Sequence, residues 1–356
     1  MARPSPRRLP ARAGPNMARS SGVSLNDIAE PDNLQGALRR AVRGTRATDA
    51  VARFCAAAER ELCLLRREIL NETVEVGRVT RFRIHDPKPR LIQAPVFRER
   101  VLQHAVMAHV GPVLERALVA DTFACRVGKG TVAAVRRAQH HARRYGWYGQ
   151  LDIRQYFASI DHGILLGQLA RRLRNGGVRR LLARIVTAGS VTFGVGLPIG
   201  ALCSQHFANH YLGVLDRALL EQSPARALVR YMDDVVFWGE TRAEVCGAVR
   251  EARKVIGATL KLTLRDEPVI QRVDQGLTLC GFRIFPGIIR AAPRRRRRFI
   301  AARRRWEGRY ARREIDALRL QRGYDAAAGI LAQVDAGEWR RRQLEISPPP
   351  GECDEA

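Results

Sequence analysis

Two adjacent aspartates, Asp233 and Asp234, interrupt an otherwise largely apolar stretch, YMDDVVFWGE at 231–240. Adjacent carboxylates repel each other, and burying a carboxylate without a partner is costly. Two interpretations account for the pair. It forms the turn of a β-hairpin between apolar strands, or it forms a site where a bound cation supplies the missing positive charge. The tetrapeptide alone does not choose between them.

A third aspartate, Asp152, closes the short apolar segment WYGQLD, which predicts a strand. A carboxylate at a strand end and one in a hairpin turn can lie side by side on neighbouring strands. Such acids can hold two divalent cations ~3.5–4 Å apart, the arrangement used for in-line phosphoryl displacement. Magnesium suits this role because it prefers oxygen ligands and keeps waters and substrate phosphates in its shell; manganese is the alternative ion. The predicted catalytic and metal-binding residues are Asp152, Asp233 and Asp234.

Arginine dominates the charge of this chain of 356 residues, whose formal net charge is +27. The lysines are Lys88, Lys129, Lys254 and Lys261. Such an excess predicts a polyanionic partner, and nucleic acid is the leading candidate. The cysteines form no CxxC pair, and no apolar run approaches the ~18 residues of a membrane span. We therefore expect a reducing, cytoplasmic location without a disulfide framework, a zinc site or a membrane partner.

Strand and helix patterns are mixed along the chain. Alternating apolar and polar residues predict a two-stranded ribbon over 79–95, a hairpin over 226–238 and a pair of short strands over 277–289. Helical periodicity predicts two helical segments in 26–70 and further helices at 97–120, 131–144, 162–173, 179–187, 201–220 and 242–257. A strongly basic helical section follows. This mixture predicts an α+β fold with a separate helical appendage.

The segment YMDD after an apolar strand resembles the signature core of reverse transcriptases, which are RNA-directed DNA polymerases. Other blocks resemble those of the family in the same order, over roughly residues 80–290. They are KPRLIQAPVFRERVLQHAV, DTFACRVGKGTVAAV, QLDIRQYFASIDHGIL, GLPIGALCSQHFANHYLGVLD and GLTLCGFRIFPG, the last resembling the primer-grip block. The resemblance implies a right-hand polymerase fold with fingers, palm and a helical thumb.

The resemblance also implies substrates and the residues that bind them. The substrates are dNTPs, a template RNA and the cDNA–primer duplex. Lys88 and Arg90 lie where basic residues of the family meet the incoming triphosphate. Phe157, five residues past Asp152, resembles the aromatic gate that crowds a ribose 2′-OH and so selects deoxynucleotides. Ordinary core packing is the alternative for this ring.

The fourth block narrows the resemblance. Many reverse transcriptases have QGxxxSP there, whereas this chain has IGALCSQ at 199–205. The variant resembles the enzymes of diversity-generating retroelements, which copy a template RNA with frequent errors at adenines, and it implies a small accessory protein. The predicted substrate-binding residues of this block are Ile199, Gly200 and Gln205. An aliphatic Ile199 removes a hydrogen-bonding group beside the nascent base pair, so base discrimination should fall; a neutral lineage variant is the alternative.

The basic section Arg294–Arg313, with interleaved aromatic residues, resembles a thumb that grips an A-form duplex through phosphates without reading sequence. A solvated helix face is the alternative. In the family, a lysine commonly follows a segment like LKLTL and acts as a general acid, but here Glu267 and Pro268 stand near that place. Lys261 or Arg265 are the candidates to replace it.

The predicted division of the chain follows these blocks. It is a disordered leader at 1–24, N-terminal helices and fingers at 25–150, a palm with part of the fingers at 151–290, a basic helical thumb at 291–343 and a disordered tail at 344–356. The leading hypothesis is an error-prone polymerase of the retroelement type. The alternatives are a reverse transcriptase of another bacterial class (retron, intron-derived or defence-associated) and a non-catalytic RNA-binding scaffold.

Overall fold

The computed structural model describes residues 20–45, 48–85, 89–189, 192–329 and 331–348. Its N-terminal part contains four helices where the sequence predicts two helical segments. They are α1 (Leu25–Ala29), α2 (Pro31–Val42), α3 (Asp49–Ala56) and α4 (Ala58–Leu70). Local signals set their starts. Ser24 and Asp27 form a capping box at α1, Pro31 begins α2, and the Thr48 hydroxyl caps α3.

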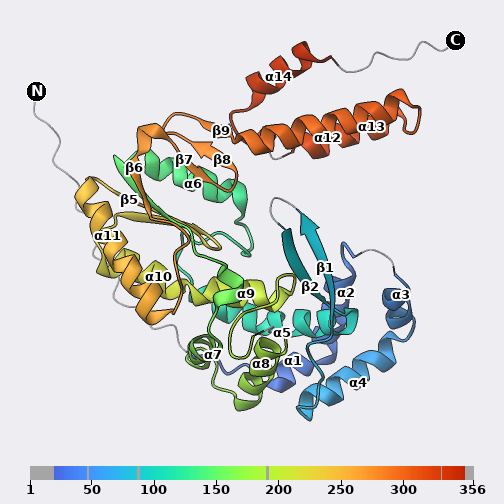
Figure 1. The fold of residues 1–356 in the computed structure, drawn as a ribbon. Coiled ribbons are helices and arrows are strands. Elements are labelled where there is room, and N and C mark those ends of the chain that lie inside the picture. Colours follow the sequence, from blue (N-terminus) through green and yellow to red (C-terminus); the bar gives the residue numbers. More distant parts are fainter. Residues whose placement is uncertain (1–19, 46–47, 86–88, 190–191, 330, 349–356) are drawn as a thin grey trace, which may run out of the picture.

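The predicted ribbon is present as β1 (Val79–His85) and β2 (Pro89–Pro95), which pair antiparallel. It stands out from the helices around it (Figure 1), and nearly all of β1 is exposed. The chain then enters α5 (Phe97–Arg116), a largely buried helix that packs against α2 and α9 (Leu202–Tyr211). At the base of the ribbon, the backbone N–H of Gln93 donates to the carbonyl of Ile199 at 2.8 Å. The ribbon is thereby joined to the fourth sequence block.

Four antiparallel strands form the central sheet in the order β4-β5-β3-β6. They are β3 (Trp147–Leu151), β4 (Ala227–Tyr231), β5 (Asp234–Gly239) and β6 (Val269–Arg272). The strands β4 and β5 form the predicted hairpin, and β3 is the predicted strand before Asp152. The strand β6 is not evident in the sequence, because VIQR is short and mostly exposed.

Both faces of this sheet are covered, which explains the uninterrupted apolar run of β5. Val235 and Phe237 join one core cluster, and Val236 and Trp238 join the other, because successive side chains of a strand point to opposite faces. Among the helices that contribute to the two clusters, α11 (Arg242–Lys254) and α6 (Thr131–Ala142) lie directly against the strands of this sheet, α11 in the first cluster and α6 in the second. Gly149 of β3 fits beneath the Phe237 ring, since a Cβ there would lie 2.5 Å from it.

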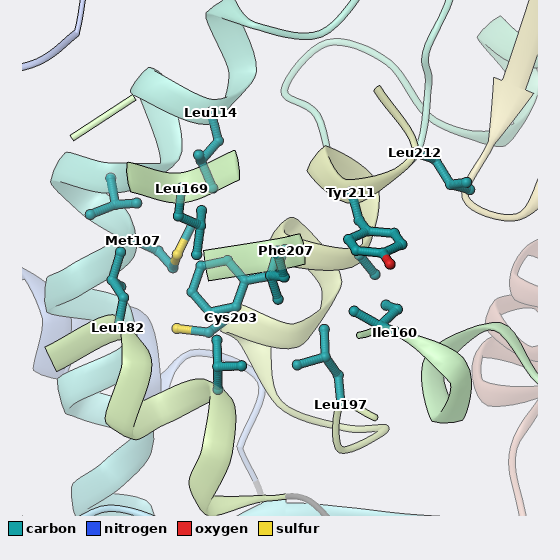
Figure 2. Packing of buried hydrophobic residues seen from close by; sticks show 14 of the residues in the cluster. Met107, Leu114, Ile160, Leu169, Leu182, Leu197, Cys203, Phe207, Tyr211 and Leu212 are labelled. Carbon is teal, nitrogen blue, oxygen red and sulfur yellow. The ribbon is translucent and has the colours of Figure 1, made fainter. Parts of the chain in front are cut away.

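The described part of the chain between β3 and β4 is mainly helical. Its elements are η1 (Tyr156–Ser159), α7 (His162–Ala170), α8 (Gly176–Ala188), α9, α10 (Gly213–Arg217) and the π-helix η2 (Ala218–Gln222). The single helix predicted over 201–220 is divided at Leu212. Figure 2 shows Phe207 and Cys203 of α9 packed among side chains such as Met107 of α5 and Leu182 of α8. This apolar contact holds the helices that support the site.

A second, three-stranded sheet leads into the C-terminal helices. Its strands are β7 (Leu277–Leu279), β8 (Phe282–Ile284) and β9 (Ile289–Ala291), where the sequence predicts a pair. The helices are α12 (Pro293–Ala311), α13 (Ala317–Ala328), η5 (Leu331–Gln333) and α14 (Gly337–Ile346). Figure 1 places α12 and α13 across from the ribbon β1–β2.

Two aromatic residues of α12, Phe299 and Trp306, pack within this helical section. Phe299 is buried, and its ring lies 5.7 Å from that of Trp339 in α14. Trp306 lies against α13, where a Cβ on Gly323 would be 2.4 Å from the indole. Their helical spacing therefore reflects helix packing, while neighbouring arginines such as Arg297 remain exposed.

The inner ends of the predicted leader and tail carry structure. The backbone N–H of Ser21 donates to the Arg172 carbonyl at 2.8 Å, and α14 continues to Ile346. The rest of the predicted leader and tail, 1–19 and 349–356, lies outside the described residues. Within the part of the chain that is described, no helix combines the length and the apolar character needed to cross a bilayer.

Candidate active site

The aspartate pair lies at the turn of the β4–β5 hairpin. Tyr231 pairs with Asp234, which leaves Met232 and Asp233 as a two-residue loop. Met232 has a φ of +59°, the left-handed conformation that tight hairpin loops favour. The first interpretation of the pair, a hairpin turn, is therefore confirmed. It does not exclude the second, because a turn at a strand end can also present its carboxylates to a cation.

The β-sheet register brings Asp152 to this turn. Leu151, the last residue of β3, pairs with Val235, so the next residue along β3 and the preceding residue of β5 are neighbours at the strand ends. These residues are Asp152 and Asp234. The backbone register thus places the strand-end acid beside one of the two hairpin acids, Asp234.

Burial and mutual repulsion disfavour the charged forms of the hairpin acids. Burial is the main cause that raises the pKa of Asp233, and the charge of Asp152 adds to it. Burial, with the charges of Asp233 and Asp152, raises the pKa of Asp234 to about 6. Because the folded-state pKa lies above the ordinary value of 3.8, Asp234 makes the fold less stable as the pH rises from about 3.8 to about 6, and the full penalty applies above about pH 6. At neutral pH, a bound cation would relieve the same repulsion.

Arg265 supplies positive charge to this group of acids. Its guanidinium forms an ion pair with the Asp152 carboxylate, and its backbone N–H donates to the Asp152 carbonyl at 2.8 Å. Arg265 and Arg90 both act to lower the pKa of Asp233 against the larger effect of burial. Arg90, predicted to meet the triphosphate, therefore lies within electrostatic range of the hairpin.

The other basic candidates are placed differently. Lys261 forms an ion pair with Asp161 at 3.1 Å, so Arg265 rather than Lys261 contacts the predicted catalytic acids. Glu267 pairs with Arg253 at the surface. Lys88, the second predicted triphosphate contact, lies outside the described residues.

The donor chemistry of the site fits magnesium or manganese. Hard carboxylate oxygens are present, and burial raises the pKa of both hairpin acids, so their charged forms are disfavoured without a counter-charge. Within the described ranges, no three acidic, histidine or cysteine side chains are grouped closely enough to hold a metal ion alone. This is compatible with magnesium, which protein carboxylates commonly bind together with waters and substrate phosphates.

Phe157 lies in η1, directly beyond the Asp152 strand end. The side chain is half-buried and packs partly against the core, and its ring centroid lies 5.7 Å from that of Tyr156. Its carbonyl accepts a hydrogen bond from the Leu197 N–H at 2.8 Å. The half-buried position is compatible with both interpretations of the ring, core packing and a nucleotide gate.

The fourth-block residues lie at the junction of ribbon and α9. Ile199 is half-buried and accepts the Gln93 hydrogen bond, and Gly200 follows with a φ of +115°. A Cβ on Gly200 would lie 2.8 Å from the Ile92 side chain, so this position requires glycine. Gln205 is exposed on α9, with its amide oxygen 3.5 Å from the Cys125 sulfur.

Two arginines that the resemblance did not identify connect separate elements of the chain near the site. Arg295 of α12 donates to the Cys280 carbonyl at 2.7 and 3.1 Å, and its guanidinium lies 4.4 Å from the Phe282 ring centroid. It ties the turn of the primer-grip block to α12. The second is Arg230, which is fully buried one residue before YMDD. Its charge within an apolar strand was the sequence signal that could have identified it.

A family model described as "Reverse transcriptase (RNA-dependent DNA polymerase)" matches residues 84–267, more than half of the chain. The matched segment contains the ribbon strand β2, the strand end at Asp152 and the hairpin. The chain belongs to the reverse transcriptase family, and it is an RNA-directed DNA polymerase.

Several known proteins are similar to the chain. Protein YkfC of Escherichia coli (strain K12) is 25% identical over 272 residues, which cover 63% of this chain and 71% of YkfC. The group II intron-encoded protein LtrA of Lactococcus lactis subsp. cremoris is 24% identical over 160 residues, covering 41% of this chain and 26% of LtrA. A solved structure of apo telomerase from Candida tropicalis, truncated from the C-terminal domain, matches with a TM-score of 0.46 and 12% identity, covering 61% of this chain and 56% of that one.

Proposed function

We propose that Asp152, Asp233 and Asp234 are the catalytic residues and hold two Mg²⁺ ions, with Mn²⁺ as the alternative. The observation that carries this proposal is the register of β3 and β5, which brings Asp152 to the hairpin. The bound ions would activate the attacking primer hydroxyl and stabilise the leaving pyrophosphate. The protein's contribution is to hold these carboxylates at adjoining strand ends, in a partly buried place where they need a counter-charge.

The substrates that we propose are dNTPs, a template RNA and the growing cDNA–primer duplex. Arg90, within electrostatic range of Asp233, would meet the triphosphate together with Lys88. Phe157, Ile199, Gly200 and Gln205 would border the nascent base pair. A primer-extension assay on an RNA template tests the whole assignment, since product should require a divalent cation and disappear with a chelator.

We also propose that the parts of the chain act as those of a right-hand polymerase. Residues 25–150 would be the N-terminal helices and fingers, 151–290 the palm with part of the fingers, and 291–343 the thumb. The position of α12 and α13 across from the ribbon supports this division. A cytoplasmic location, where template RNA and dNTPs are available, fits this function.

Salt should weaken duplex binding strongly if α12 contacts phosphates. Each neutralised phosphate adds about 0.7–0.9 to the slope of log affinity against log salt concentration. Replacing exposed Arg297 and Arg304 of α12 by glutamine should therefore lower that slope by about 1.4–1.8, measured by fluorescence anisotropy over a salt series. The matched control replaces exposed Arg242 and Arg250 by glutamine. Both lie in α11, which covers the central sheet. Equal slopes for both double variants would exclude α12 as the phosphate-binding surface.

We further propose that the enzyme belongs to the diversity-generating type, with frequent errors at template adenines and a small accessory protein. The support is the IGALCSQ block, whose Ile199 is joined to the ribbon through its carbonyl. This hydrogen bond involves only the backbone of Ile199. A substitution of the side chain can therefore change the group beside the nascent base pair while the hydrogen bond is kept.

Restoring an amide at this position should raise fidelity. Ile199→Gln is expected to lower misincorporation opposite adenine by about tenfold, since 1.4 kcal/mol of added discrimination has that effect. Sequencing of cDNA made on one template by both proteins measures it. A wild type that copies adenine as faithfully as other bases would remove the retroelement assignment. Equal error rates in an error-prone wild type and the variant would remove only the role of Ile199.

The similarity to LtrA favours a second candidate, an enzyme related to intron-encoded reverse transcriptases. The same cDNA sequencing separates the two classes, because an intron-type enzyme has no reason to make errors mainly at adenine. Family membership makes the non-catalytic scaffold the weaker alternative.

A further inference from the structure

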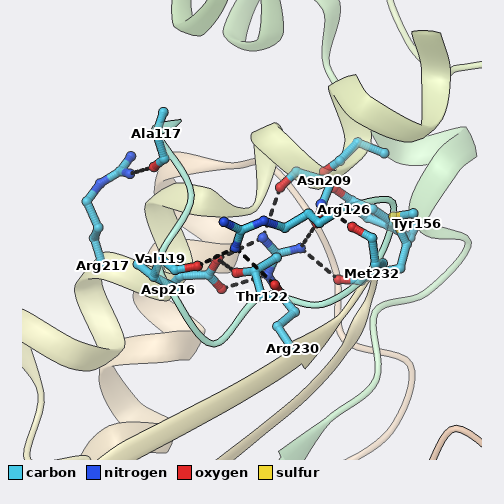
Figure 3. Close-up of polar contacts among 12 residues, drawn as sticks. Ala117, Val119, Thr122, Arg126, Tyr156, Asn209, Asp216, Arg217, Arg230 and Met232 are labelled. Atoms are coloured by element: carbon cyan, nitrogen blue, oxygen red, sulfur yellow. Dashed lines mark hydrogen bonds and ion pairs between the residues drawn. The ribbon is translucent and has the colours of Figure 1, made fainter. Parts of the chain in front are cut away.

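Arg230, in β4 directly before the YMDD turn, is a fully buried arginine whose surroundings point to a role in the site. Both Arg230 and Asp216 of α10 have no exposed surface. The Arg230 guanidinium donates to both oxygens of Asp216, each at 2.7 Å (Figure 3). A bidentate contact of this kind fixes the plane of the guanidinium.

The remaining guanidinium N–H groups reach α9 and the turn. Nη1 donates to the Asn209 amide oxygen at 2.8 Å, and Nη2 donates to the Asn209 carbonyl at 2.9 Å. Nη1 also donates to the carbonyl of Met232 at 3.0 Å. Met232 immediately precedes Asp233, so one buried group connects helices α9 and α10 to the loop that carries the hairpin acids.

The same part of α9 also supports the Asp152 side of the site. The hydroxyl of Tyr156, the first residue of η1 beyond Asp152, donates to the carbonyl of Ala208. Ala208 is the neighbour of Asn209, the residue that contacts Arg230. Two adjacent residues of α9 therefore contact both sides of the site. Ala208 contacts η1, which follows Asp152, and Asn209 contacts the hairpin loop through Arg230.

Stability alone does not explain this arrangement. A buried ion pair gains little over well-packed apolar residues, because two charges must be removed from water. Met232 gives a more specific reason, since its left-handed φ of +59° is unfavourable for a residue with a Cβ. Such a conformation persists when its surroundings fix it, and the hydrogen bond from Arg230 to the Met232 carbonyl does so.

We propose that Arg230 is a positioning residue that sets the spacing of Asp233 and Asp234 relative to Asp152, and thereby the affinity of the site for divalent cations. The proposal rests on the proposed function of the three aspartates. It predicts that loss of the contact to Met232 weakens cation binding even when the fold and duplex binding are intact.

The test measures the Mn²⁺ dissociation constant of the free protein by electron paramagnetic resonance, with the melting temperature and duplex affinity in parallel. Arg230→Met alone leaves Asp216 buried without its partner and is expected to unfold readily. The double variant Arg230→Met with Asp216→Asn removes both charges and keeps an acceptor for Thr122, whose hydroxyl donates to Asp216 at 3.1 Å. We expect Mn²⁺ binding about tenfold weaker in the folded double variant.

A second variant, Arg230→Lys, keeps the positive charge beside Asp216. It lacks the planar guanidinium that contacts both Asp216 and the Met232 carbonyl. It should bind Mn²⁺ less tightly than the wild type and more tightly than the double variant. Arg217→Met is the matched control, because half-buried Arg217 follows Asp216 and donates to the Ala117 carbonyl at 3.0 Å, away from the hairpin. It should leave Mn²⁺ binding unchanged.

Unchanged Mn²⁺ affinity in folded Arg230 variants, or equal weakening in Arg217→Met, would overturn the positioning role. Asp233→Asn, measured alongside, separates this result from failure of the proposed site. If Asp233→Asn weakens Mn²⁺ binding and the Arg230 variants do not, only the role of Arg230 is lost. If Asp233→Asn binds Mn²⁺ as the wild type does, the metal site and the positioning role are both overturned.

Discussion

Replacing Asp233 by asparagine is expected to reduce primer extension at least ~10³-fold, or about 4 kcal/mol of transition-state stabilisation, while duplex affinity stays within about twofold. The substitution keeps the size of the side chain and removes its charge, so a cation bound as proposed would lose a ligand. The basic surface of α12 is untouched, so phosphate binding should persist. Single-turnover extension on an RNA template and anisotropy on the same duplex measure the two quantities.

Asp274→Asn is the control for this change. Asp274 is an exposed acid paired with Arg272, next to β6 and outside the predicted site. It should extend primers at the wild-type rate. Near wild-type extension by the Asp233 variant would show that Asp233 is not a metal ligand, and loss of duplex binding in that variant would show that its effect is not on the chemical step.

Replacing Phe157 by valine should admit ribonucleotides, with the preference for deoxynucleotides falling by about ten- to a hundredfold, the range expected when steric exclusion in a pocket is relaxed. The smaller side chain leaves room for a 2′-OH beside the strand end of Asp152. The ratio of kcat/KM for dNTP and rNTP incorporation measures it. Fully exposed Phe193 offers the control, Phe193→Val, which should not change the ratio.

Core packing of Phe157 would give a different result. Its ring packs against Tyr156 and partly against the core, so truncation would then lower the melting temperature and leave sugar preference unchanged. The two measurements together decide between the interpretations that the sequence left open.

The elements nearest the predicted site were accessible from sequence because their signals are local. The hairpin followed from two apolar runs with a tight turn at Met232 and Asp233, and the ribbon over 79–95 from alternation around its prolines. Asp152 followed from its place at the end of an apolar strand. The fold class was also predictable, since an α+β fold required only that strands and helices be mixed.

Other features depend on contacts between residues distant in sequence. The strand β6 is mostly exposed and is defined by its pairing with β3, not by its composition. The ion pair of Arg265 with Asp152 joins residues 113 positions apart. No local periodicity reveals such features, because tertiary packing decides them.

The order of the central sheet gives the two sides of the site different backbone support. Asp152 follows β3, which is hydrogen-bonded to strands on both edges, whereas Asp233 lies in a two-residue loop at the tip of a hairpin. Local opening begins where backbone hydrogen bonds are fewest, so the remaining fluctuations of the site should concentrate at the hairpin tip, where the Arg230 hydrogen bond to the Met232 carbonyl limits them. An ion shared between the two sides would restrict that motion, and its affinity would include the entropy lost there. A dNTP that binds after the ion would then meet a hairpin tip that is already ordered, so its binding would be more favourable. This is a form of cooperativity that needs no change in average structure.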